Sequence, residues 1–299
     1  MRPAPTIGPG KPIFGADKRR FEQIKTMSTN SISSPVLTAE QLDQFVTQGY
    51  VVLRGAIPPV IVERTREGIL GSLGMTQGDS STWKREQRVL GDHWPYTVDC
   101  MTSAVYGAAE QICGPNIHRG EINSPYREAI GLDPLMGGFI PVLNYPINGK
   151  PEFHSPSSHH IDGMHHCTLW PRFMYLVVFG YLTDTDAYDG ATALWPGAHR
   201  RVFEHWWPKH GLEAGRIPDH VPGLDFGEAI PFVGRAGDVL LMHYLMPHDG
   251  TPNFGDHIRV GINSSIVPAA EQPYRPKLGS PDDSWLPMDY TLRTDNLRP

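Results

Sequence analysis

Four residues have types and spacings that could bind a metal ion beside an acidic ligand. His160-Ile161-Asp162 is an H-x-D pattern, and His248 and Arg259 follow later in the chain. On a β-strand, side chains two residues apart point to the same face, so His160 and Asp162 could meet one ion. The pattern alone is weak evidence, because a chain with 14 histidines contains roughly one H-x-D by chance, for example in an exposed turn.

The segment before Arg259 strengthens the metal interpretation. An apolar strand, Asp238–Met242, runs into a turn that carries His248. Arg259 stands eleven residues after His248, at the start of the next strand. In a roll of two sheets, adjacent strands joined in this way bring the histidine and the arginine side by side into one cavity.

Two histidines, one carboxylate and an arginine indicate a specific chemistry. Two neutral imidazoles and one carboxylate on one face of an octahedral ion leave three positions open, which suits an Fe(II) that binds a co-substrate and O2 together. The planar arginine could pair with one end of a dicarboxylate whose other end chelates the iron. Zinc is the competing metal, but a zinc site gives the arginine no role. His243 is a competing ligand, although its place inside the strand fits a three-ligand face less well than that of His248.

Helices with one strand among them are expected near the N-terminus. Thr38-Ala39-Glu40-Gln41 forms a capping box, and Gly49 ends the helix that it begins. The other N-terminal elements are a strand over Tyr50–Leu53, a helix that opens at Pro58-Pro59 and a helix over Met101–Cys113.

The rest of the chain, from about residue 137, reads as short apolar strands between turns. The pattern predicts a mostly β (α+β) fold, a sandwich or barrel with flanking N-terminal helices. Residues 1–35 are rich in Pro, Gly and Ser and are expected to be a flexible N-terminal extension, so that residues 36–299 form a single domain. The clearest strands are Phe139–Leu143, Phe173–Leu182, Asp238–Met242 and Arg259–Val267.

Composition narrows the function classes. The chain has 26 Lys and Arg against 32 Asp and Glu, a net charge of −6, which disfavours nucleic acid as a partner. No apolar run reaches the roughly 20 residues of a membrane helix, and the first residues lack the apolar core of a signal peptide. We therefore expect a cytoplasmic protein without membrane contact. The protein is expected to be a monomer or homodimer. Cys100, Cys113 and Cys167 show no C-x-x-C spacing and are expected to be buried thiols.

Four sequence blocks, taken in order, resemble the phytanoyl-CoA dioxygenase (PhyH) family of non-haem Fe(II), 2-oxoglutarate-dependent oxygenases. The resemblance covers the chain from Thr38 to about Val267, and the order and spacing of the blocks are more specific than any one of them. The blocks are residues 37–55, His160-Ile161-Asp162, Gly190–His199 and Gly237 through Asn253 to Arg259.

The resemblance implies a double-stranded β-helix, the cupin-like jelly roll, with a metal between its sheets. It places the catalytic metal ligands at His160, Asp162 and His248, and the 2-oxoglutarate arginine at Arg259. Phe179 is expected to line the 2-oxoglutarate site, or else to be a core aromatic, and Asn144 is the candidate upstream co-substrate contact. His199 is expected to be structural, and Trp170, Trp206 and Trp207 to be packing residues. The implied cofactors are Fe(II), 2-oxoglutarate and O2.

The expected reaction is oxidation of a small-molecule metabolite, with hydroxylation as the default and 2-oxoglutarate converted to succinate. Halogenating relatives lack the metal carboxylate, so Asp162 disfavours halogenation. Desaturation, cyclisation and epoxidation within secondary metabolism stay open, as do a zinc-dependent or a non-catalytic cupin-like protein. His165 and His166 follow the H-x-D and are expected either near the substrate pocket or metal, or on the surface.

Overall fold

The computed structural model describes residues 36–90, 95–114, 117, 121–122, 135–136, 139–162, 167, 174–210, 217–218, 220–221 and 223–267, with the backbone alone at 95–96, 121–122, 135–136 and 207–210. The expected extension, residues 1–35, lies outside the described residues, and so do His165, His166, Trp170 and the side chain of Trp207. The described chain is rich in antiparallel sheet and has few helices.

A five-stranded antiparallel sheet, in the order β1-β8-β5-β10-β4, forms the larger layer. Its strands are β1 (Tyr50–Leu53), β4 (Ile140–Asn144), β5 (Leu176–Tyr181), β8 (Val239–His243) and β10 (Arg259–Ile266). β10 pairs with β4 and β5, and the register sets Arg259 opposite Asn144 and Asn263 opposite Phe179. Because directly paired residues of an antiparallel ladder share a face, these four side chains project from the same face of the sheet.

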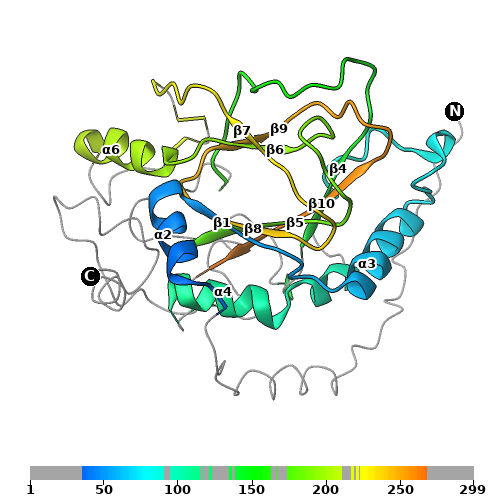
Figure 1. Cartoon of the computed structure of the whole chain (residues 1–299), viewed down its shortest axis with the longest axis horizontal. Coiled ribbons are helices and arrows are strands. Elements are labelled where there is room, and N and C mark those ends of the chain that lie inside the picture. Colours follow the sequence, from blue (N-terminus) through cyan, green and yellow to red (C-terminus); the bar gives the residue numbers. More distant parts are fainter. Residues whose placement is uncertain are drawn as a thin grey trace, which may run out of the picture. The chain divides into compact units, whose positions relative to one another are not determined.

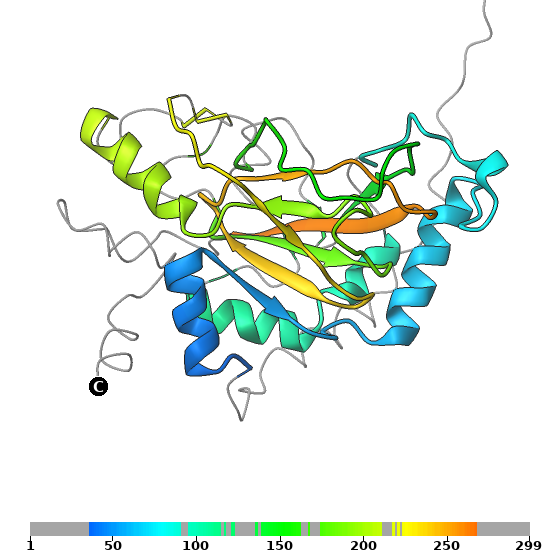
Figure 2. The same ribbon diagram turned by 45° about the horizontal axis from the view of Figure 1, so that its top comes forward.

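A three-stranded antiparallel sheet, in the order β7-β6-β9, forms the second layer. Its strands are β6 (Thr192–Leu194), β7 (Ile230–Phe232) and β9 (His248–Gly250), and His160 adds an isolated antiparallel bridge to His248. Two views of the ribbon show this sheet on one side of the larger sheet and helix α4 on the other (Figures 1 and 2). The two-residue strands β2 (Glu121–Ile122) and β3 (Leu135–Met136) pair with each other.

The N-terminal helices begin and end close to where the sequence predicts. The capping box is confirmed, because Gln41 N donates to Thr38 Oγ1 at 3.2 Å and Thr38 N donates to Gln41 Oε1 at 2.9 Å. Gly49 ends this helix with φ 82°, a left-handed conformation that favours glycine. The described helices are α2 (Ala39–Gln48), α3 (Pro59–Ser72), α4 (Ser103–Cys113) and α6 (Ala198–His210), with 3-10 helices at Ser80–Thr82 and Pro95–Cys100.

The alternation of side chains along the strands separates two apolar cores. On one face of the larger sheet, Leu241 and Ile262 pack with residues of α3 and α4, such as Ile112. On the other face, Leu240 packs with residues of the smaller sheet, such as Phe232. The interior between the two sheets is therefore the space toward which Arg259, Asn263, Asn144 and Phe179 project.

Two segments differ from the sequence expectation. The chain after residue 137 was expected to form short strands between turns, but helix α6 begins at Ala198, and its residues Val202, Phe203 and Trp206 lie at helical spacing and are buried in the core between the sheets. His248 was expected in a turn but begins strand β9, because the backbone of β6 on one side and of His160 on the other pair with it. The packing role expected of Trp206 is confirmed.

The remaining expectations concern thiols and membranes. Cys100, Cys113 and Cys167 are buried and free of disulfides. No helix among the described residues is long and apolar enough to cross a membrane.

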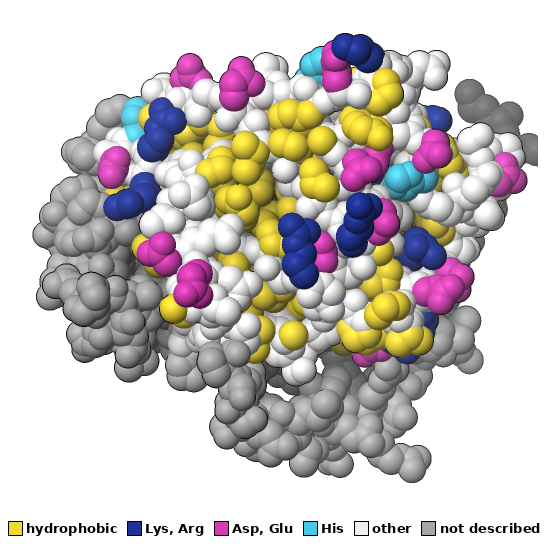
Figure 3. All heavy atoms as spheres, viewed as in Figure 1, with side chains coloured by type: hydrophobic (Ala, Val, Ile, Leu, Met, Phe, Trp, Pro, Cys, Tyr) yellow, Lys and Arg dark blue, Asp and Glu magenta, His cyan; other side chains and the backbone are white. Residues whose placement is uncertain are grey.

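A groove of about 390 Å³ opens where the edge strands β1 and β7 approach each other. Apolar side chains gather over this region of the surface (Figure 3). β7 and β9 are the opposite edges of the smaller sheet, so β6 separates this groove from His248. The groove is lined by Gln44, Tyr50, Val52, Arg54, Leu194, Ile230, Pro231, Phe232 and Val233.

His199 gives the fold an acid-sensitive contact. It lies in the first turn of α6, fully buried, against Gly49, where a Cβ would be 2.4 Å from its Nδ1. Its Nε2 donates to the carbonyl of Val46 at 3.2 Å. Burial lowers the pKa of His199 to about 3, whereas an unfolded histidine has a pKa of about 6.5. Between these values the unfolded chain binds more protons, so stability falls as pH drops from 6.5 towards 3.

We predict that His199→Gln weakens this acid dependence. At pH 5 the wild type should have lost about 2 kcal/mol through His199, since 1.5 pKa units at 1.36 kcal/mol each separate pH 5 from the unfolded pKa. Urea unfolding of the metal-free protein at pH 7 and pH 5 measures the loss, which should shrink by about that amount in the variant. Replacement of the exposed His154 by Gln is the control and should leave the loss unchanged. An equal loss in the wild type and in His199→Gln would contradict the assignment.

Candidate metal centre

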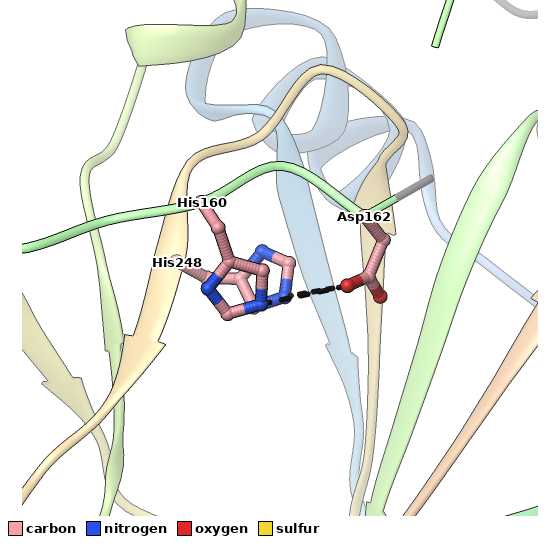
Figure 4. Close-up of side chains that lie close together, drawn as sticks. All are labelled: His160, Asp162 and His248. Atoms are coloured by element: carbon pink, nitrogen blue, oxygen red, sulfur yellow. Dashed lines mark ion pairs between the residues drawn. The ribbon is translucent and has the colours of Figure 1, made fainter. Parts of the chain in front are cut away.

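His160, Asp162 and His248 come together at one end of the space between the sheets (Figure 4). Each can offer one ligand atom, and the three atoms lie within 4.8 Å of one another. Asp162 Oδ1 is 3.5 Å from His160 Nε2 and 3.6 Å from His248 Nε2. The carboxylate thus faces both imidazoles through one oxygen.

Backbone hydrogen bonds fix the two histidines relative to each other. His160 N donates to the carbonyl of His248 at 3.0 Å, and His248 N donates to the carbonyl of His160 at 2.9 Å. Residues paired in this way have side chains on the same face, and the two ring centroids are 4.4 Å apart. Two imidazole rings are therefore held side by side by the main chain.

In each histidine, Nδ1 points away from Asp162 and has a neighbour of its own. Nε2, which faces Asp162, is therefore available to a metal ion. His248 Nδ1 lies 3.0 Å from the carbonyl of Met246. Because a carbonyl can only accept, Nδ1 carries a proton, and Nε2 is the nitrogen that faces Asp162 and is placed to bind a metal. On the other side, His160 Nδ1 is 4.0 Å from Asp249 Oδ1, and Ser158 Oγ donates to Asp249 Oδ2 at 2.6 Å.

Asp162 is ionised in this arrangement. Burial raises the pKa of its carboxyl, but the interactions with His248 and His160 outweigh burial and hold the pKa below its usual range. Its second oxygen, Oδ2, accepts a hydrogen bond from Asn263 Nδ2 at 3.2 Å. The donor set is two imidazole nitrogens and one carboxylate oxygen, which fits a divalent transition metal such as Fe(II).

Arg259 is a buried cation with no anionic partner among the described residues. Its side chain is on the inner face of β10 and the residue is 3% exposed. Nε and Nη1 are buried and have no hydrogen-bond partner among the described residues. Burial lowers the pKa of Arg259 from its ordinary value, yet guanidinium stays protonated in proteins. An unpaired buried charge is costly, so the arrangement fits an acidic ligand that enters the site.

The guanidinium of Arg259 leans along β10 towards the metal ligands. A Cβ on Gly261 would lie 2.5 Å from Arg259 Nη1, so the guanidinium lies directly over Gly261. Gly261 is two residues from Asn263, which contacts Asp162. The guanidinium carbon is also 5.4 Å from the ring centroid of Phe179 and 5.9 Å from that of Tyr181. The cation thus lies beside two neighbouring aromatic rings of β5.

Asn144 lies opposite Arg259 on the neighbouring strand. Its Nδ2 donates to the carbonyl of Thr251 at 2.8 Å, which ties β4 to the chain after β9. Asn144 therefore has a structural contact as well as a place beside Arg259.

Other histidines lie away from the cluster. His243 is on the face of β8 opposite to Met242 and is fully buried, with its ring 5.0 Å from that of His199 and 6.2 Å from that of Phe45. His159 packs edge-on against Phe226, at 4.7 Å between ring centroids. Neither belongs to the group that could hold a metal.

Two details of the sequence reasoning were wrong. The H-x-D was expected on a strand, but only His160 forms a bridge and Asp162 lies in a bend, so strand alternation does not bring them together. The strand that leads to His248 and the strand that begins at Arg259 were expected to be adjacent, but β5 lies between β8 and β10, and His248 belongs to β9 in the other sheet. The two residues face the interior from opposite layers.

Sequence reasoning missed Asn263, Gly261 and Asp249. The signal for the first two was present, since both follow Arg259 at even spacing on an expected strand and so share its face. Asp249 follows His248 directly, and only the bridge to His160 brings its carboxylate near that ring.

Comparison with known protein families identifies the family of this chain. The family described as phytanoyl-CoA dioxygenase (PhyH) matches residues 45–261. No curated protein matches the chain.

The solved structures to which this chain is similar include three of low sequence identity. The non-heme alpha ketoglutarate dependent carbocyclase SnoK from nogalamycin biosynthesis is 16% identical over 82% of this chain and 90% of its own, with a TM-score of 0.49. HygX from Streptomyces hygroscopicus, with nickel and 2-oxoglutarate bound, is 15% identical over 81% and 91%, with a TM-score of 0.49. The epimerase SnoN, in complex with Fe3+, alpha ketoglutarate and nogalamycin RO, is 16% identical over 77% and 83%, with a TM-score of 0.46.

TM-scores under 0.5 carry no argument about the reaction. The assignment of the family therefore rests on the match to the family, which spans most of the chain. The chain belongs to the phytanoyl-CoA dioxygenase (PhyH) family and is a 2-oxoglutarate-dependent non-haem iron oxygenase.

Proposed function

We propose that His160, Asp162 and His248 hold one Fe(II) and that Arg259 binds the distal carboxylate of 2-oxoglutarate. The observation that carries the proposal is the buried guanidinium of Arg259, which has no partner on Nε and Nη1 among the described residues and leans towards the triad. A zinc site built from the same three ligands would leave that cation unexplained.

Each residue has a role in this proposal. When bound together with 2-oxoglutarate and O2, Fe(II) would supply the chemistry that oxidises the substrate. In that reaction 2-oxoglutarate is converted to succinate and CO2. His248 and His160 present Nε2 to the metal, because Met246 holds Nδ1 of His248 and Asp249 lies beside Nδ1 of His160. Asp162 adds the charge that favours a divalent ion.

The co-substrate pocket in this proposal is the space around Arg259. The guanidinium fork forms two parallel hydrogen bonds with a carboxylate. The ring of Phe179 bounds the pocket on one side, and Asn144 stands opposite Arg259 on β4. These residues orient the ligand and exclude water from the pair.

We further propose that residues 36–299 form one oxygenase domain with a double-stranded β-helix core. The facing antiparallel sheets, with His160 extending the smaller one next to β9, support this architecture. Residues 1–35 are proposed as an extension outside it.

The substrate in this proposal is a small-molecule metabolite, and hydroxylation is the default outcome. SnoN has been solved in complex with nogalamycin RO, and HygX with hygromycin B bound. By analogy we propose a natural product or similar metabolite as the substrate of this chain. The presence of Asp162 argues against halogenation. Cyclisation, desaturation and epoxidation need the same residues, and substrate placement selects among them.

The first test of the proposal separates His248 from His243. We predict that His248→Ala loses stoichiometric Fe(II) binding and 2-oxoglutarate turnover, because one of three metal ligands is removed. His243→Gln should keep iron binding, because that side chain projects from the other face of its sheet. Iron content after anaerobic loading and succinate formation are the measurements. Iron loss in His243→Gln with retention in His248→Ala would contradict the assignment.

The second test separates the co-substrate from the metal. A charge-assisted pair is typically worth about 1.5–3 kcal/mol, and each 1.4 kcal/mol is about tenfold in affinity. We therefore predict that Arg259→Ala raises the apparent KM for 2-oxoglutarate about ten- to a hundredfold or more, with little change in iron content. Arg259→Lys should recover part of the loss, since it keeps the charge but lacks the planar fork. Unchanged anaerobic 2-oxoglutarate affinity in Arg259→Ala would mean that another group binds the co-substrate.

A further inference from the structure

Asp162 is the least restrained of the three proposed metal ligands. The two histidines belong to a pair of reciprocal backbone hydrogen bonds, at 3.0 and 2.9 Å. Asp162 lies instead in a bend two residues beyond that bridge. Its carboxylate is partly exposed, at 21% of the side chain. Without further support, rotation of this carboxylate would move the oxygen that faces the imidazoles.

Asn263 supplies that support from the most firmly held strand. β10 has eight residues and is paired on both sides, with Asn263 opposite Ile140 on one strand and Phe179 on the other. Asn263 Nδ2 donates to Asp162 Oδ2 at 3.2 Å. The orientation of the amide is determined, because an ionised carboxylate only accepts and must meet the nitrogen rather than the oxygen.

We propose that Asn263 is a positioning residue that holds Asp162 as a ligand through one oxygen. By occupying Oδ2 it turns Oδ1 towards His160 and His248, at 3.5 and 3.6 Å. A carboxylate that binds through one oxygen uses one position on the metal, which leaves more positions for the co-substrate and O2. This inference rests on the proposed metal site.

The other half of the amide supports a role beyond packing. Asn263 Oδ1 is buried and has no hydrogen-bond partner among the described residues. A polar side chain with a buried unpaired acceptor is unfavourable in a strand whose neighbours are apolar. The favourable interaction of the Asn263 side chain at this position is the hydrogen bond that Nδ2 donates to Asp162.

The experiment measures metal affinity rather than turnover. Full-length wild type, Asn263→Ala and Asn263→Leu are titrated with Co2+ under anaerobic conditions, with Ser265→Ala as the matched control. Leucine keeps the branched shape and the number of side-chain heavy atoms of asparagine and removes the donor. Ser265 lies two residues further on the same face of β10 and is also half-buried. Loss of an outer hydrogen bond to a metal ligand typically costs about 10–100-fold in metal affinity.

We expect the Co2+ dissociation constant to rise about 10–100-fold in both Asn263 variants and to stay unchanged in Ser265→Ala. The visible Co2+ absorption should also change in the Asn263 variants alone, because Asp162 is then free to rotate or to bind through both oxygens. Thermal unfolding of the metal-free proteins identifies any variant that fails to fold. Asn263→Leu tests the proposal if Asn263→Ala does not fold.

Wild-type affinity and spectrum in a folded Asn263 variant would overturn the inference while leaving the metal site intact. An equal loss in Ser265→Ala would also overturn it, since the effect would then be general to the strand. His248→Ala is included to distinguish a failure of the proposed metal site from a failure of the proposed role of Asn263. If His248→Ala binds Co2+ as the wild type does, the proposed metal site itself fails, and the role of Asn263 fails with it.

Discussion

A guanidinium buried between two sheets, with two of its nitrogens unpaired, is the constraint on which the rest of this site depends. Arg259 is 3% exposed, and its Nε and Nη1 have no partner among the described residues. Folding such a group without an anion is unfavourable, so the structure is organised to receive one. Gly261 leaves room for the guanidinium, which lies beside the neighbouring rings of Phe179 and Tyr181 on β5.

The two sheets contribute different residues to the candidate site. The larger sheet contributes the arginine, its aromatic neighbours and Asn263, all from strands with partners on both sides. The smaller sheet contributes His248 and, through one bridge, His160. Tyr181 joins the layers, since its hydroxyl donates to the carbonyl of Phe232 and accepts from Thr192 N, both at 3.0 Å. The distance between co-substrate and metal residues is thus set by how the layers pack.

The sequence correctly predicted structural features that depend only on neighbouring residues. The capping box at Thr38 and the helix end at Gly49 are properties of a few neighbouring residues, and both are confirmed. The spacing predicted that His160, Asp162 and His248 lie together, as the structure shows, but not the elements that bring them together. Strand β9 depends on pairing with distant residues, and Asp162 reaches the histidines from a bend. Such long-range pairing leaves no trace in a short window of sequence.

The most direct test of the account is an anaerobic titration of 2-oxoglutarate into the Fe(II)-loaded wild-type protein, followed by visible absorption. Chelation of iron by the keto acid produces a charge-transfer band that neither component shows alone. The account predicts a saturable band at one equivalent with Fe(II) and none with Zn2+. Stoichiometric iron without any band at saturating 2-oxoglutarate would contradict it, because the arginine and the metal ligands would then not serve one co-substrate.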